Sequence, residues 1–250
     1  CIRDSRYIFR YYDSREEIQT FIIKIIRVVI KVKVSYEDVI KNEQIAIFIE
    51  KADMTLAQLG YTEHSFIHAG KVTQVAGMIL EELMFSKRDI ELAKIAGYMH
   101  DIGNVINRTD HAQSGAVMAY RLLDNMGMEA GDIAQVITAI GNHDENTAYP
   151  VDAVTAALII ADKTDVRSSR VRNQDSTTFD QHDRVNFAVK ESKVKVENKK
   201  RIVVKIKLDK KICSVMDYFE IFLDRMILCR KAAEKLCVEF CLVINKERVI

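Results

Sequence analysis

Apolar residues recur at helical spacing through the middle of the chain, and this pattern constrains the fold more than any other sequence feature. Helices are predicted near residues 65–84, 89–100, 112–126, 132–140 and 151–161, with short loops that contain Gly, Asn or Asp between them. One proline and 9 glycines in 250 residues leave few positions that would interrupt a helix. The pattern therefore predicts a mostly α fold built as a helical bundle.

Three segments are predicted along the chain. Residues 1–50 form an N-terminal helical segment, in which the apolar residues between Ile18 and Ile30 have helical spacing, although their β-branched side chains leave a strand open. Residues 51–190 form the helical domain. Residues 191–250 form a small α+β module with the order ββαβ. Val194 and Val196 before a turn predict a first strand, alternation at Ile202–Leu208 a second strand, Val215–Leu236 a helix and Phe240–Ile244 a last strand.

The charge and the cysteines exclude several classes of protein. A net charge of +1 does not indicate a nucleic-acid-binding protein, although residues 191–250 carry an excess of Lys and Arg. None of the 5 cysteines forms a Cys-x-x-Cys pair, so we interpret them as free thiols in a reducing, cytoplasmic setting. The apolar stretch Phe21–Val34 is too short and too basic to span a membrane. A homodimer through the N-terminal helix or the module is compatible with the sequence.

Histidines and carboxylates in the helical domain are candidate metal ligands, since imidazole and carboxylate bind divalent Mn, Fe, Co, Ni and Zn. His100-Asp101 follows an apolar helix, and Gly103 after it would permit a close backbone approach. Asp162 ends the apolar run 156–161, where a buried carboxylate is costly without a positive partner. A metal ion would supply that partner.

The order of these residues resembles the HD-domain metal-dependent phosphohydrolases, whose pattern is a His, a His-Asp pair and a distal Asp. The matching stretches are Glu63-His64-Ser65, Met99-His100-Asp101-Ile102-Gly103 and Ile160-Ala161-Asp162. The resemblance covers about residues 55–175 and implies an HD-type helical domain. The additional His111 and His143 are similar to the six-ligand, two-metal branch of that superfamily, which implies two divalent ions per chain, with Fe or Mn favoured and Mg, Ni or Co as alternatives.

The resemblance also assigns roles to individual residues. His64, His100, Asp101 and Asp162 would bind the first metal. Asp101 would bridge to a second metal held by His111 and His143, and His100 and Asp101 would form the catalytic pair. His68, one helical turn after His64, is an alternative first ligand, but the Glu-His-Ser context favours His64.

Basic residues after Asp162 are candidates for binding a substrate phosphate. Lys163, Arg167 and Arg170 lie within ten residues of it, and Arg guanidinium groups bind phosphate oxygens in pairs. Asp165 lies in the same run, and we expect it to pair with an Arg. The dipeptide His182-Asp183 lies in a polar run, and we interpret it as structural or as part of the site's rim.

The predicted reaction is hydrolysis of a phosphate ester or anhydride by metal-activated water. The preferred substrate is a small phosphorylated molecule, a nucleotide or dinucleotide, and the sequence does not separate phosphomonoester, phosphodiester and pyrophosphate substrates. Asn146–Pro150 lacks the Gly-Tyr-Pro signature of the subfamilies that open cyclic dinucleotides, and Asn104 stands where many His-Asp-Ile-Gly proteins carry Lys. The alternative is a nucleotide-binding sensor or regulatory HD domain with little or no turnover. Retention of every expected ligand favours the enzyme.

Overall fold

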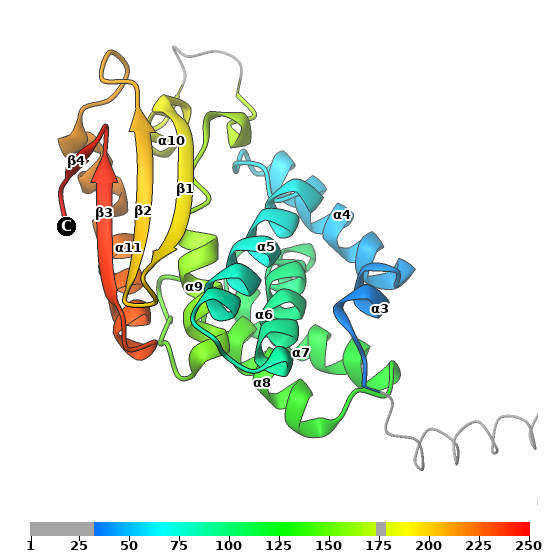
Figure 1. Cartoon of the computed structure of the whole chain (residues 1–250). Coiled ribbons are helices and arrows are strands. Elements are labelled where there is room, and N and C mark those ends of the chain that lie inside the picture. The colour runs from blue at the N-terminus through cyan, green and yellow to red at the C-terminus, as the bar shows by residue number, and fades with distance from the viewer. Residues whose placement is uncertain (1–32, 174–178) are drawn as a thin grey trace, which may run out of the picture.

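The computed structural model describes residues 33–173 and 179–250 (Figure 1). The helix predicted over Ile18–Ile30 lies outside the described residues.

A bundle of helices forms the first part of the structure. Ser65, Ser86 and Asp152 cap the helices that follow them by accepting hydrogen bonds from backbone N–H groups, which explains where α5, α6 and α9 begin. The predicted helices over residues 65–161 are confirmed. The elements are α3 (Tyr36–Ile40), α4 (Glu43–Gln58), α5 (Phe66–Glu82), α6 (Lys87–Met99), the 3₁₀ helix η1 (Ile102–Val105), α7 (His111–Asn125), α8 (Ala130–Gly141) and α9 (Ala153–Lys163).

Helix α4 crosses the boundary that the sequence placed after residue 50. Its Ile45, Ile49 and Leu56 are buried in the same core as α5 and α6. Residue 50 therefore does not mark a break in the fold, because one helix and one core continue through it.

The remaining elements, from η2 to β4, are called the C-terminal module from here on, and they include the ββαβ segment predicted over residues 191–250. They are η2 (Ser168–Arg170), α10 (Gln181–Ala188), β1 (Val189–Glu197), β2 (Arg201–Leu208), α11 (Val215–Lys235), β3 (Glu239–Ile244) and β4 (Glu247–Arg248). The sheet has the order β1-β2-β3-β4. Strands β1 and β2 are antiparallel, whereas β2 and β3 are parallel and joined through α11, so the ββαβ order is confirmed with the short β4 added.

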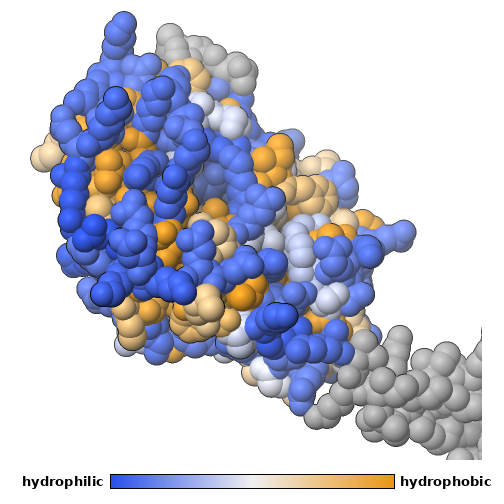
Figure 2. All heavy atoms as spheres, viewed as in Figure 1, coloured by the Kyte–Doolittle hydropathy of each residue, from blue (hydrophilic) through white to orange (hydrophobic). Residues whose placement is uncertain are grey.

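Helix α11 lies behind the sheet in the view of Figure 1 and also packs against α9. Along β2, Ile202, Val204 and Ile206 are buried, while Lys205 and Lys207 are exposed on the opposite face of the sheet. Figure 2 shows this outer face, where hydrophilic side chains surround a smaller apolar area.

Helix α9 is the centre of the molecule. Every residue from Val154 to Ala161 is buried, and α5, α6, α8 and α11 all pack against this helix. A helix covered on all sides is fixed in position, so Asp162 in its last turn is held rigidly.

Within the described residues, no helix combines the length and apolar character that a membrane crossing requires.

Candidate metal centre

His100 and Asp101 lie where α6 ends. His100 caps the helix and Asp101 precedes η1, so the chain changes direction there and both side chains can face one point. A Cβ atom at Gly103 would lie only 2.0 Å from the His111 carbonyl oxygen, and so only glycine lets η1 approach the start of α7 this closely. The close approach expected at Gly103 is confirmed, and it brings Asp101 beside His111.

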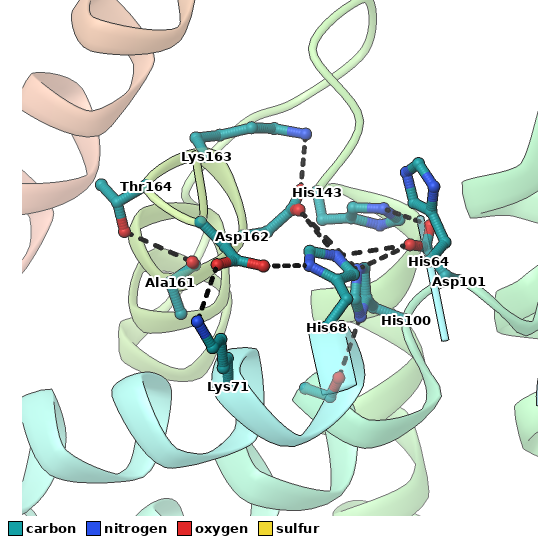
Figure 3. Close-up of polar contacts among 12 residues, drawn as sticks. His64, His68, Lys71, His100, Asp101, His143, Ala161, Asp162, Lys163 and Thr164 are labelled. Carbon is teal, nitrogen blue, oxygen red and sulfur yellow. Dashed lines mark hydrogen bonds and ion pairs between the residues drawn. The ribbon is translucent and has the colours of Figure 1, made fainter. Parts of the chain in front are cut away.

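Six side chains that could hold metal ions converge between the helices. Their ligand atoms form three overlapping groups in which all atoms lie within 4.8 Å of one another. Five of the six residues, all except His111, are labelled in Figure 3, and dashed lines mark contacts among them. The full set is His68 from α5, His100 and Asp101 at the end of α6, His111 at the start of α7, His143 after α8 and Asp162 in α9.

The cluster has two halves that share one carboxylate. In the first half, His68 Nε2 lies 3.2 Å from His100 Nε2 and 3.4 Å from Asp162 Oδ1. In the second half, His111 Nε2 lies 3.3 Å from His143 Nε2. Asp101 faces both halves, because its Oδ2 is 3.0 Å from His100 Nε2 and its Oδ1 is 3.5 Å from His111 Nε2.

The imidazole tautomers show that the cluster fits cations. The Nδ1 atoms of His100, His111 and His143 contact backbone carbonyl oxygens at 2.6–3.0 Å, and a carbonyl oxygen can only accept. Nδ1 therefore carries the proton in each neutral ring, and Nε2 presents a lone pair. Lone pairs that face one another and carboxylate oxygens in a buried site repel, and divalent cations would remove that repulsion. The residues therefore fit divalent metal ions.

The charges of the carboxylates agree with this fit. Burial alone would raise the pKa of Asp101, but His100 and the other nearby imidazoles hold it well below its usual value. Burial would likewise raise the pKa of Asp162, but the Lys163 ammonium, together with His68, lowers it well below its usual value. Burial lowers the pKa of His143 to about 3, so this imidazole is neutral at physiological pH. Ionised carboxylates and neutral imidazoles are the forms that bind metal.

Among the described residues, the cluster of possible ligand atoms includes His68 and not His64. His68 is buried within α5, whereas His64 precedes the Ser65 cap and donates from Nδ1 to the Thr62 carbonyl oxygen, 2.7 Å away. Figure 3 shows His64 beside the converging ligands and without a drawn contact to them. The cluster therefore favours the alternative, His68, over His64, although His64 also lines the adjacent cavity. Which of the two histidines binds a metal ion stays a prediction.

Asp165 orients His68. Its Oδ2 lies 2.8 Å from His68 Nδ1, which leaves His68 Nε2 directed at the other ligands. Arg167 Nε donates to Asp165 Oδ1 at 3.0 Å, so the expected pairing of Asp165 with an Arg is confirmed. The sequence did not indicate the contact to His68, because 97 positions separate the two residues.

The basic residues after Asp162 have different surroundings from one another. Arg167 donates from all three nitrogens to Asp165, Ser169 and Glu63, and it does not line the cavity at the cluster. Its position does not support the predicted phosphate contact, because each of its three nitrogens already donates to an oxygen of the protein. Lys163 and Arg170 do line the cavity, and phosphate binding by these two stays a prediction.

The cavity at the cluster has a volume of about 210 Å³ and lies between the helical domain and the C-terminal module. Asp101, His111, His143 and Asp162 of the ligand cluster line one side of it, together with His64. The opposite side comes from α10 and α11 and includes His182, Asp183, Asn186 and Arg225. The polar run around His182 and Asp183 therefore forms a helix that reaches the rim of the site, which agrees with the rim interpretation of this dipeptide.

Two further residues near the cluster were not predicted to belong to the site. Buried Asn104 donates from Nδ2 to Asp101 Oδ1 at 3.0 Å and so holds the shared carboxylate. Arg108 donates from Nη1 to Asn104 Oδ1 at 3.3 Å and lines the cavity. Asn104 is thus part of the site although it differs from the expected Lys. A neutral amide at this position binds the ligand carboxylate without neutralising it.

Comparisons with known proteins found one family and two similar proteins. Residues 65–172 match the family described as HD domain. The chain is 26% identical over 165 residues to an uncharacterised protein of Methanocaldococcus jannaschii, covering 56% of this chain and 62% of that protein's length. It is also similar to the crystal structure of a predicted HD superfamily hydrolase from an uncultured Thermotogales bacterium, with 25% identity and a TM-score of 0.40 over 50% of this chain and 68% of that one.

Proposed function

Since residues 65–172 of this chain form an HD domain, we propose that the protein is a metal-dependent phosphohydrolase that uses two divalent ions. One observation carries the proposal: four buried imidazoles and two ionised carboxylates direct their ligand atoms at one another beside an accessible cavity. Divalent ions in such a site would activate water and neutralise the charge on phosphate oxygens.

Side chains of the protein would position the metal ligands and attract the substrate phosphate. Asp101 would hold the two halves of the site at a fixed separation, because its two oxygens face different imidazoles. Asn104 and Asp165 would keep Asp101 and His68 in position through their hydrogen bonds. The cations that line the cavity, including Lys163 and Arg170, would attract a phosphate to the ligand cluster.

The cavity favours a compact substrate. Its volume of about 210 Å³ lies below the ~300–1,000 Å³ that is usual for sites of drug-sized ligands. We therefore propose a small phosphorylated molecule or a single nucleotide, and we rank a dinucleotide below them. The nucleotide-binding sensor is the second candidate, and it differs from the enzyme by binding without turnover.

The cellular location, the oligomeric state and the identity of the metal stay predictions. Free cysteines at positions 213, 229, 237 and 241 are compatible with a reducing cytoplasm. A homodimer and a specific choice of Fe or Mn are likewise expectations, since the donor set of imidazoles and carboxylates suits several divalent metals.

Metal content and phosphate release together test the proposal. The purified protein and its His68→Ala, Asp101→Ala and His64→Ala variants would be analysed for bound metal, and phosphate release would be followed over sugar phosphates and nucleotides with added Mn. We expect about two ions per chain in the wild type and in His64→Ala. We expect loss of metal and turnover in Asp101→Ala, because this carboxylate serves both halves, and loss of at least one ion in His68→Ala.

Three outcomes would contradict parts of the proposal. Absence of metal after reconstitution would overturn the metal centre. Two bound ions with nucleotide binding and no turnover would favour the sensor. A His64→Ala variant that loses metal while His68→Ala retains it would reverse the ligand assignment.

A further inference from the structure

Four cations among the described residues line the cavity, and three of them contact carboxylate or carbonyl oxygens of the protein. Lys163 Nζ lies 2.6 Å from Asp162 Oδ2 and 3.8 Å from Glu145 Oε1. Arg225 Nε lies 2.6 Å from the same Glu145 oxygen. Arg170 uses Nε and Nη1 for the carbonyl oxygens of Glu63 and Asp165. These side chains are already held by oxygen acceptors of the protein.

Arg108 differs from them. Across residues 33–173 and 179–250, no carboxylate forms an ion pair with its guanidinium, and the recorded polar contacts both involve Nη1. Its Nε and Nη2 have no hydrogen-bond partner among those residues. These are the two nitrogens whose N–H bonds point in parallel, and such a pair matches two oxygens of a phosphate.

The position of Arg108 is fixed from two sides. Nη1 donates to Asn104 Oδ1 at 3.3 Å, and the guanidinium lies over the Tyr61 ring at 5.6 Å from its centre. A planar cation over an aromatic face is stabilised by the ring's electron density. The side chain is therefore oriented before any ligand arrives, which lowers the entropy lost on binding.

Arg108 also lies beside the ligand cluster. Its Nη1 is 3.4 Å from His111 Nε2, the nitrogen that faces His143 and Asp101. A phosphate oxygen directed at the second half of the cluster would therefore lie close to this guanidinium. The same cavity holds Arg108, Tyr61 and the ligands Asp101 and His111.

We propose that Arg108 is the residue that binds the phosphate group of the substrate, with Nε and Nη2 as a two-point donor and Tyr61 as its support. This role replaces Arg167 in the phosphate-binding set and places the main phosphate contact on the η1–α7 loop. It rests on the proposed hydrolase function, since it assigns a binding residue to the same site.

Phosphate binding tests the role without requiring turnover. Inorganic phosphate, the product of any phosphatase reaction, would be titrated into the Mn-saturated protein by calorimetry, for the wild type and for Arg108→Ala, Arg108→Lys and Arg121→Ala. Arg121 is the matched control, because it is an exposed arginine on α7. A charge-assisted hydrogen-bonded pair predicts a loss of about 10- to 100-fold in phosphate affinity for Arg108→Ala. Arg108→Lys should be intermediate, because it keeps the charge without the paired donors, and Arg121→Ala should change by less than about twofold.

Several results would overturn the assignment or separate it from the proposed reaction. Unchanged phosphate affinity in Arg108→Ala at saturating Mn would overturn it, and so would an equal loss in Arg121→Ala. Full affinity in Arg108→Lys would overturn the two-point contact. Arg108-dependent phosphate binding in a protein without turnover would support the binding role and reject hydrolysis. Turnover with normal KM and kcat in Arg108→Ala would retain hydrolysis and reject the role.

Discussion

Replacing Gly103 with alanine should disturb both the stability of the protein and its metal site. The added Cβ would lie 2.0 Å from the His111 carbonyl oxygen, 2.5 Å from Gly115 N and 2.7 Å from Ser114 Oγ. The two closest atoms belong to the backbone of α7, which cannot rotate away as a flexible side chain would. Either η1 or the start of α7 must therefore move, although packing fixes both.

The expected magnitude follows from the cost of overpacking. Extra methylene groups in a packed interior cost about 1–3 kcal/mol and sometimes more, and the backbone contacts at Gly103 place this substitution at the upper end. For a chain of this size, ~1 kcal/mol lowers Tm by about 2–4 °C, so ~3 kcal/mol predicts a decrease of about 6–12 °C. Because Asp101 precedes η1 and His111 begins α7, the same movement should weaken metal binding by about 10- to 100-fold.

The assay combines thermal unfolding, followed by circular dichroism in EDTA, with titration of Mn into the folded protein. Gly131→Ala is the control, because Gly131 lies in α8 and a Cβ there would meet no atom within 4 Å. That variant should be neutral or gain up to about 1 kcal/mol, since alanine restricts the unfolded chain. If Gly103→Ala unfolds within about 2 °C of the wild type and binds Mn equally well, the inferred contact between η1 and α7 is refuted.

Three further predictions concern single side chains. Asp165→Asn should weaken metal binding about 10- to 100-fold, because it weakens the bond that orients His68; an unchanged Mn titration would reject that role. Burial lowers the pKa of His143 to about 3, so the unfolded state binds more protons than the folded state between pH 6.5 and 3. The free energy of unfolding in EDTA should therefore fall as the pH falls through this window, by up to ~1.4 kcal/mol per pH unit for one proton. This slope should be shallower in His143→Gln, and an equal slope would contradict the lowered pKa. Burial raises the pKa of Cys229 to about 12. At pH 8, a thiol reagent should therefore modify exposed Cys237 in the folded protein and Cys229 only after unfolding. Mass spectrometry of the labelled peptides checks this, and modification of Cys229 before Cys237 would contradict it.

The sequence predicted the helices and the ββαβ module because both have regular patterns. Apolar spacing and few chain breakers define α5 to α9, and alternation defines β2. Helix α10 was not predicted, since its eight residues are mostly polar. Its formation depends on the Asp180 cap and on burial of Val185 and Ala188 in the folded core, neither of which a periodicity argument can detect.

Five of the six clustered residues were among the predicted ligands, and the sixth, His68, was the alternative to His64. His68, Val72, Ala76 and Ile79 share the buried face of α5, and helical spacing could have placed this histidine in the interior. Sequence context favoured His64 instead, although Ser65 after it is a typical residue for the start of a helix.

The partners of the arginines could not be predicted from the sequence. Arg167 pairs with Glu63 across 104 positions, and long side chains have many partners within reach until the fold is known. The sequence therefore located candidate cations near Asp162 and could not show which of them keeps a free donor group. Arg108, whose Nε and Nη2 are free among the described residues, lies in a different loop.

The packing of α11 against α9 affects how the chain acquires its structure during synthesis. All of the metal ligands have left the ribosome once Asp162 has emerged, yet one side of α9 is covered by a helix that begins at Val215. Until that helix arrives, the nascent domain exposes apolar surface of its central helix, which is the kind of surface that chaperones bind. The helical domain and the module are therefore coupled in folding, and the metal site reaches its final form only when a later part of the chain has been translated.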